Sequence, residues 1–254
     1  MKLKLLILNC SLLLPHFAFP ASSIPHMPIA WKIINKNDFS KILAQLQSMY
    51  NLNSSFRMEI THSSFQDYTS VNPSDEIKGY LCIDAGKVRS KLLGILSIMT
   101  PEYKMVLDSA SQVIILSDIE KNNADMIQQV DVLGYLNHCN AIQYYVEKDI
   151  TVYRMDFDEA FPYKYIDISI DHNGLLHKID YFMNHAVNDT SNSNTNASKP
   201  RVTVRFENYL LSAVFPKNYF DEKQYVQLVN GKMVPTVNYS NFKIIDFRNS
   251  HYSK

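Results

Sequence analysis

The segment 149–210 alternates between apolar and polar side chains with a period of two, and no other feature of the sequence restricts the fold as strongly. In its first stretch, the residues that share one face are Thr151, Tyr153, Met155 and Phe157. The alternation returns over 165–170, 175–183 and 202–207. A strand with one apolar and one polar face packs on one side and meets water on the other, as in antiparallel sheets. The segment therefore predicts consecutive strands of one sheet.

The size and charge of the chain narrow its class further. It has 254 residues and no net formal charge. This length suits one domain with a well-buried core. A nucleic-acid-binding domain carries a clustered basic excess, so we expect no nucleic-acid partner here. The chain has 6 glycines and no glycine-rich loop of the kind that holds phosphates, so we expect neither a nucleotide nor another cofactor.

Residues 1–23 have the features of a secretory signal peptide. Lys2 and Lys4 give it a positive start, and 5–14 is an apolar run that is too short to cross a bilayer. We therefore predict an exported mature domain of residues 24–254. No later segment is apolar enough to predict a transmembrane span in the mature chain.

Cysteine usage leaves two questions open. Cys10 could carry a lipid anchor, but Asn9 is an unusual residue before a modified cysteine, and we favour a cysteine that is removed with the signal. Cys82 and Cys139 remain in the mature domain. They either form a disulfide, which export permits, or are two small buried apolar residues. Their spacing suits no metal, so we expect no metal site.

Local patterns predict the other elements. A helix is expected from the Asn37-Asp38 cap to residues 51–53, and a second, shorter helix over 124–138. The apolar positions of the first helix are Phe39, Ile42, Leu43, Leu46, Met49 and Tyr50. Alternation and turn residues predict further strands at 56–60, 78–84, 88–95, 103–107, 112–116, 141–147 and 242–247. Asn230-Gly231 predicts a tight hairpin, and the polar segment 188–199 predicts an exposed, mobile loop.

Catalytic motifs are absent from the sequence. Asp156, Asp158 and Glu159 form the densest acidic group, but the first two lie on the polar face of one predicted strand, whereas acid–base catalysis needs carboxylates that converge across a cleft. His172 lies in a predicted turn and His177 on the strand after it, and both are interpreted as solvated histidines. We therefore expect no catalytic residues and no enzyme activity.

The order of elements resembles the periplasmic lipoprotein-carrier family and its outer-membrane lipoprotein-acceptor relatives. The resemblance covers about residues 37–210 and lies in the motifs Gly79-Tyr80-Leu81, Lys87-Val88-Arg89, Pro101–Asp108, Val113–Leu116, Asp171–Leu175 and Arg201–Phe206. The chain departs from the family at Asp108-Ser109, where the family has Asp-Gly, and in the tail after Val214. The resemblance implies an α+β fold of mainly antiparallel β: an incomplete (half) β-barrel of about ten or eleven strands covered by helices.

The same resemblance implies a periplasmic location and an apolar concavity for acyl chains, with Arg89 in the place of the family's gating arginine. The residues expected to face this interior are Phe56, Met58, Ile60, Tyr153, Met155 and Phe157. The alternative is that these side chains fill a closed core. Acyl-chain binding needs buried CH₂ groups, at about 0.8 kcal/mol each, and no catalytic group.

Two functions follow as hypotheses. The first is a non-catalytic, exported carrier of an apolar ligand, either a lipid or an acylated protein. The second is a structural or interaction module of a cell-envelope assembly that binds a protein partner along a sheet edge. The carrier requires an apolar interior that can take up a ligand, whereas the interaction module requires an exposed apolar patch or a free strand edge.

Overall fold

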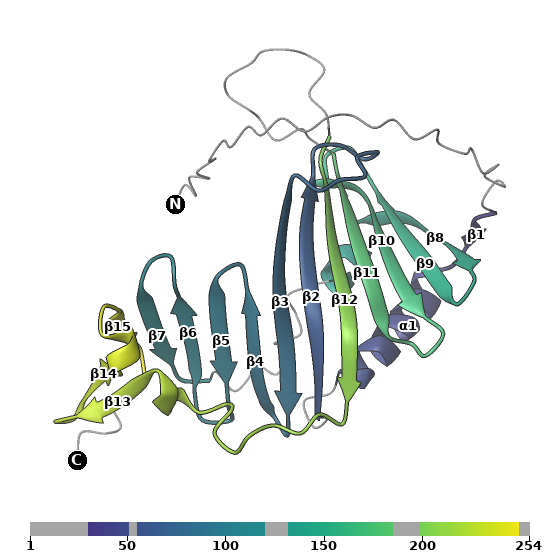
Figure 1. Ribbon diagram of the computed structural model, residues 1–254. Helices are drawn as coiled ribbons and strands as arrows, with labels where there is room; N and C mark the ends of the chain where they lie inside the picture. The colour runs from purple at the N-terminus through teal and green to yellow at the C-terminus, as the bar shows by residue number, and fades with distance from the viewer. Residues whose placement is uncertain (1–29, 51–54, 120–131, 185–198, 249–254) are drawn as a thin grey trace, which may run out of the picture. The chain divides into compact units, whose positions relative to one another are not determined.

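Most described residues belong to one sheet of 13 strands (Figure 1). The computed structural model describes residues 30–50, 55–119, 132–184 and 199–248. The predicted signal 1–23, most of the loop 188–199 and most of the predicted helix 124–138 lie outside these ranges. From Trp31 onward the chain forms a single unit.

The strands run as two meanders that meet in the middle of the sheet, in the order β1-β8-β9-β10-β11-β12-β2-β3-β4-β5-β6-β7-β15. Their bounds are β1 Lys32–Ile33, β2 Ser55–Phe65, β3 Asp75–Asp84, β4 Lys87–Leu92, β5 Ile95–Met99, β6 Lys104–Asp108, β7 Val113–Ser117, β8 Cys139–Glu147, β9 Ile150–Phe157, β10 Tyr163–Asp171, β11 Leu176–Met183, β12 Arg201–Leu211 and β15 Lys243–Asp246. Neighbouring strands are antiparallel except β15 and β7, which are parallel. The meanders join where β12 pairs with β2, so that Leu211 lies opposite Phe56.

The predicted hairpins are confirmed. Strands β6 and β7 flank the turn after Asp108, and β13 (Val226–Val229) pairs with β14 (Lys232–Pro235) around Asn230-Gly231. Asn230 and Gly231 have φ angles of 49° and 77°, as a tight hairpin turn with two left-handed residues requires. The predicted strand 88–95 is divided, because the chain turns at Leu93-Gly94 between β4 and β5.

Helix α1 (Lys36–Met49) begins earlier than predicted. Its capping residue is Asn35, whose Oδ1 accepts a hydrogen bond from the Asp38 backbone N–H at 2.9 Å. The Asn35 Nδ2 donates in return to the Asp38 side chain at 2.7 Å. This reciprocal pair satisfies free donors at the start of the helix. The prediction of an Asn37-Asp38 cap was therefore wrong in its position. The second helix, α2 (Val132–Leu136), has five residues.

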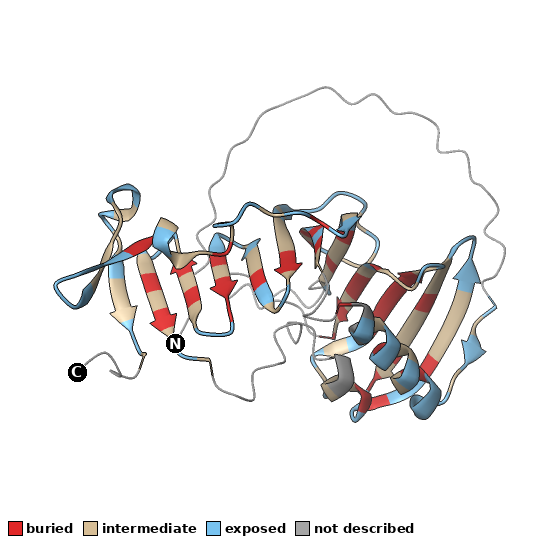
Figure 2. Ribbon diagram, turned by 90° about the horizontal axis from the view of Figure 1, so that it is seen from below, coloured by how far each residue is buried: buried red, intermediate tan, exposed pale blue. Residues whose placement is uncertain are grey.

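The sheet has two apolar clusters, which lie on opposite faces. The first, the α1-covered cluster, includes Phe39, Leu43, Tyr50, Phe56, Met58, Ile83, Met155, Phe157, Ile166, Ile168 and Ile179. The second, the C-terminal cluster, includes Cys82, Leu96, Ile98, Met105, Leu107, Ile114, Leu116, Phe220, Tyr225 and Val226. Cys82 and Ile83 are successive residues of β3, and successive side chains of a strand point to opposite faces. Figure 2 shows buried residues along the strands, with α1 on one side of the sheet.

The prediction of a helix-covered α+β half-barrel of ten or eleven strands was wrong. The described chain is mainly β, its 13-stranded sheet is mixed and open, and it has two α-helices. A 14-residue helix is about 21 Å long and covers about four strands spaced about 4.8 Å apart, so α1 spans only part of the sheet. The tail after Val214 covers the other cluster, with two 3₁₀ turns (Glu222–Gln224 and Val237–Tyr239) and the β13–β14 hairpin instead of α-helices.

Candidate functional site

The six apolar residues predicted to face an interior all belong to the α1-covered cluster. Phe56, Met58, Met155 and Phe157 are buried, and Ile60 and Tyr153 are partly buried against them. Alternation of β2 and β9 places these side chains on the face that α1 covers. The ring centroids of Phe39 and Tyr153 are 5.2 Å apart. The six residues therefore lie together and pack beneath the helix in this structure, and their contact with a ligand stays a prediction.

The C-terminal end of α1 is tied to the sheet by tyrosine hydroxyls. The Tyr50 hydroxyl lies 3.0 Å from that of Tyr209 on β12 and accepts a hydrogen bond from the Leu176 backbone N–H at 3.0 Å. The Tyr209 hydroxyl donates to the Leu176 carbonyl at 2.5 Å. Burial raises the pKa of both tyrosines, so both stay neutral and act as hydrogen-bonding groups. The rest of the attachment of α1 depends on apolar side chains, chiefly Phe39 and Leu43.

Arg89 lies on the opposite face of the sheet from these six residues. It pairs with Cys82 across β3 and β4 and faces the C-terminal cluster. Its guanidinium donates to the Tyr219 carbonyl at 2.6 Å and to the Tyr225 hydroxyl at 2.7 Å, and it lies 4.5 Å from the centroid of the Tyr219 ring. In this structure Arg89 therefore holds the C-terminal tail against the sheet, away from the α1-covered cluster.

Both cysteines of the mature domain are buried free thiols. Cys82 belongs to the C-terminal cluster and Cys139 to the α1-covered cluster. Of the two alternatives left open by the sequence, the structure shows the one without a disulfide. Burial raises the pKa of each thiol, which keeps both protonated and unreactive.

A thiol titration tests this arrangement. The exported protein, unfolded in denaturant without reductant, is expected to react with two equivalents of a thiol reagent, from Cys82 and Cys139. The folded protein is expected to react slowly, because both side chains are at most 3% exposed. The control is the same titration after reduction, which should give an unchanged count. A count that rises from zero to two on reduction would establish a disulfide.

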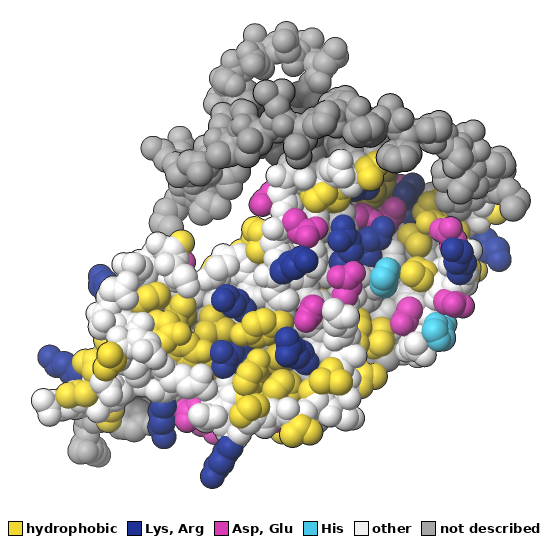
Figure 3. Space-filling view, in the orientation of Figure 1, with side chains coloured by type: hydrophobic (Ala, Val, Ile, Leu, Met, Phe, Trp, Pro, Cys, Tyr) yellow, Lys and Arg dark blue, Asp and Glu magenta, His cyan; other side chains and the backbone are white. Residues whose placement is uncertain are grey.

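The face of β9–β12 that points away from α1 is polar, as the alternation predicted, but it is not simply solvated. Arg154 donates two hydrogen bonds to Asp167, at 2.7 and 2.6 Å, between the rings of Trp31 and Tyr165. On the next strand, Asp180 pairs with Lys178 at 2.7 Å. Asp167 and Asp180 are 8% and 5% exposed. Figure 3 shows this face, with basic and acidic side chains gathered together.

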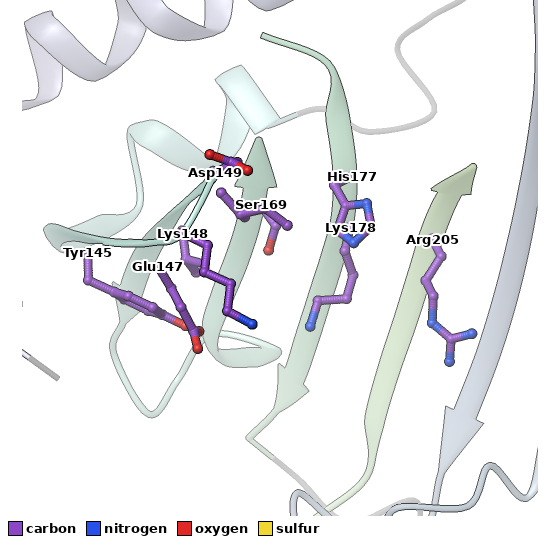
Figure 4. Close-up of a pocket in the computed structure, with 10 residues that line it drawn as sticks. Tyr145, Glu147, Lys148, Asp149, Ser169, His177, Lys178 and Arg205 are labelled. Atoms are coloured by element: carbon purple, nitrogen blue, oxygen red, sulfur yellow. The ribbon is translucent and has the colours of Figure 1, made fainter. Parts of the chain in front are cut away.

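A pocket of about 610 Å³ opens on this polar face beside the β8–β9 hairpin (Figure 4). The residues that line it are Tyr145, Glu147, Lys148, Asp149, Ile150, Val152, Ser169, His177, Lys178 and Arg205. Lys148 is at the tip of the hairpin, with a φ angle of 53°. A bulge between β10 and β11, where Ser169 pairs with Lys178 and Ile170 with Leu176, turns His177 toward the same side as Lys178. The pocket thus collects side chains from five strands.

Sequence reasoning did not identify this pocket. His177 was interpreted as a solvated histidine, and no site was predicted in the alternating segments 165–170 and 202–207, which contain Ser169 and Arg205. The polar faces themselves were visible in the alternation, and the strands that carry them were predicted. The bulge at His177, which changes the face of that side chain, has no clear sequence signal.

The predicted acidic group Asp156, Asp158 and Glu159 does not converge on a cleft. The Asp156 carboxylate accepts a hydrogen bond from Gln143 at 3.0 Å, and that of Asp158 accepts one from Asn140 at 2.6 Å. Within the ranges that the structure describes, no three His, Cys, Asp or Glu side chains are placed to hold a metal ion. None of the helices in those ranges is long and apolar enough to span a membrane.

Comparison with known proteins gives no family assignment. No family model matches the chain, and no curated protein matches it. Among solved structures, an uncharacterized conserved protein from Thermus thermophilus has 6% identity and a TM-score of 0.40, over 72% of this chain and 96% of its own. MucB, solved in complex with MucA(peri), has 14% identity and a TM-score of 0.38, over 74% and 59%.

A domain from Vibrio parahaemolyticus that is assigned to outer-membrane lipoprotein sorting has 8% identity and a TM-score of 0.30, over 75% of this chain and 99% of its own. No family model supports the predicted resemblance to lipoprotein carriers. These identities and TM-scores are too low to assign a family, a ligand or a partner.

Proposed function

We propose that the mature chain is an exported, non-catalytic carrier of an apolar ligand, in which the acyl chain of a lipid or an acylated protein binds between α1 and the sheet. The observation that carries the proposal is that the amphipathic helix α1 packs on the larger of the two apolar faces of the sheet. This face bears Met58 and Met155 as well as aromatic rings. Methionine and aromatic side chains adapt to ligands of variable shape.

Uptake of an acyl chain requires α1 to move away from the sheet. Leu43 and Phe39 would then exchange contacts with the sheet for contacts with the ligand, so that the ligand replaces helix side chains in the same apolar layer. Each buried CH₂ contributes about 0.8 kcal/mol, which lets a long acyl chain offset the displacement of a few apolar side chains. The export signal predicted at 1–23 supports an envelope location for this activity.

Native mass spectrometry and lipid extraction test the proposal. The exported protein is purified without detergent, and we expect about one acyl species per chain. Ile60→Glu, which places a carboxylate at the margin of the α1-covered cluster, is expected to lower retention by about tenfold, because burying a charge beside an acyl chain is costly. Leu228→Glu is the matched control, since Leu228 is 64% exposed on β13, and its retention should equal that of the original protein. A clean apo mass together with no uptake of a fluorescent fatty acid would rule out the carrier.

A second candidate is the interaction module, and the edge of the sheet favours it. Within the described residues, β1 pairs with β8 at Lys32–Tyr144 and Ile33–Gln143, although β8 runs for nine residues. The edge near Val146, which is 61% exposed, could accept a strand from a protein partner. A ligand-free chain that captures an envelope protein, and loses it when Val146 is replaced by proline, would support this candidate.

A further inference from the structure

We propose that the pocket on the polar face binds a phosphate group, supplied either by a soluble phosphate compound or by a lipid headgroup. This site lies on the opposite face of the sheet from the α1-covered cluster and is independent of the carrier function proposed above.

Three hydrogen-bond donors form a row across neighbouring strands at one end of the pocket. Ser169 on β10 lies directly opposite Lys178 on β11, which lies directly opposite Arg205 on β12. Neighbouring strands are about 4.8 Å apart, so adjacent members of the row can bind oxygens of one phosphate. His177 lines the same end, and Lys148 lies across from it on the hairpin (Figure 4).

The donors in this row have capacity left for a ligand. Ser169 is 3% exposed, and its hydroxyl has no hydrogen-bond partner among the described residues, although it lines the pocket. Lys178 uses one of its three N–H donors on Asp180. The Arg205 guanidinium lies 3.9 Å from the Glu76 carboxylate, which is beyond hydrogen-bonding distance. The Ser169 hydroxyl lines the pocket without a protein partner in the described ranges and can therefore donate to a ligand there.

The opposite end of the pocket is acidic and has an apolar wall, and this difference between the two ends sets the orientation of a ligand. Glu147 and Asp149 lie beside the hairpin and repel an anion, so the phosphate belongs at the Ser169–Arg205 end. Tyr145, Ile150 and Val152 provide an apolar wall for the rest of the molecule. A phosphate presents more oxygens than a carboxylate, which suits a row of donors from three strands. The volume of about 610 Å³ suits a small organic ligand.

The first test is a titration of the exported protein with inorganic phosphate at constant pH and ionic strength, with chloride as the reference. The readout is the NMR signal of the His177 ring, identified by the loss of that signal in His177→Gln. We expect a saturable shift. Arg205→Gln should weaken binding by about tenfold and Ser169→Ala by about threefold. Arg57→Gln is the matched control, because Arg57 also makes a long contact with a carboxylate, 3.8 Å to Glu59, on the same face but outside the pocket.

The second test uses vesicles of phosphatidylcholine with and without phosphatidylglycerol, in a flotation assay. If the protein binds inorganic phosphate, and only Arg205→Gln and Ser169→Ala weaken this binding, the ligand class is a soluble phosphate compound. Vesicle binding that Arg205→Gln abolishes and Arg57→Gln preserves, without a response to inorganic phosphate, would identify a lipid headgroup. The proposal would be overturned if Arg205→Gln and Arg57→Gln weakened binding equally. It would also be overturned if the protein responded neither to inorganic phosphate nor to vesicles. Acyl retention plays no part in these readouts, so their outcome is separate from that of the carrier test.

Discussion

Phe39→Ala is expected to lower the free energy of unfolding by about 3–5 kcal/mol, the largest single-residue effect we anticipate on the α1-covered cluster. The Phe39 side chain is fully buried (0% exposed) and packs on the Tyr153 ring. Its removal leaves a cavity between α1 and the sheet, and α1 has few polar contacts to hold it in place. Urea unfolding, followed by circular dichroism and by tyrosine fluorescence, measures the change.

Lys41→Ala is the matched control for this substitution. Lys41 lies on the same helix with its side chain 78% exposed, and its ion pair with Asp38 is on the surface. Exposed ion pairs contribute about 0–1 kcal/mol, so the control should change stability little. A loss below about 1 kcal/mol in Phe39→Ala would mean that the packing of α1 contributes little to the fold, since complete loss of a buried phenyl ring costs several times more.

Arg89→Leu is expected to destabilise the protein by about 2–4 kcal/mol and to release the C-terminal tail. The substitution removes charge-assisted hydrogen bonds to the Tyr219 carbonyl and the Tyr225 hydroxyl. Hydrogen exchange should therefore become faster in residues 215–242 than in β9–β12. Arg89→Lys keeps the charge but not the planar fork, and an intermediate loss is expected.

Lys91→Leu serves as the control for Arg89→Leu, because Lys91 is exposed and lies two residues further along β4 on the same face. It should change stability by no more than about 0.5 kcal/mol. The acyl retention of folded Arg89→Leu protein should equal that of the original, since Arg89 faces away from the α1-covered cluster. A selective loss of ligand with unchanged exchange in the tail would instead favour the gating role that the family resemblance implied.

The sequence predicted most of the strands because alternation and turn chemistry are local signals. The β6–β7 and β13–β14 hairpins follow from Asp108 and from Asn230-Gly231, and the six apolar residues of the cluster follow from alternation. The parallel pairing of β15 with β7 joins Lys243 to Val113 across most of the second half of the chain, and no local pattern encodes such a pairing. The half-barrel prediction gave the wrong strand number and helical cover, because local patterns do not show which distant strands join one sheet or which segments cover its faces.

The sequence predicted some parts of the candidate sites and not others. The apolar cluster was predicted because burial follows from the period of a strand. The role of Arg89 was not, because its partners Tyr219 and Tyr225 come from a tail that the resemblance does not cover. The phosphate pocket depends on the lateral register of Ser169, Lys178 and Arg205, and register between strands is set by packing of the whole sheet.

The seam between β12 and β2 has a consequence for assembly. Strands β2–β7 and β8–β12 are each sequential meanders that can form from local hairpins, whereas the seam joins segments far apart in the chain and must form late. Until it forms, each half exposes a long, unpaired edge of eleven residues, β2 or β12. The same two edges match when they come from different molecules, so the fold has a built-in route to dimers that exchange halves at high concentration.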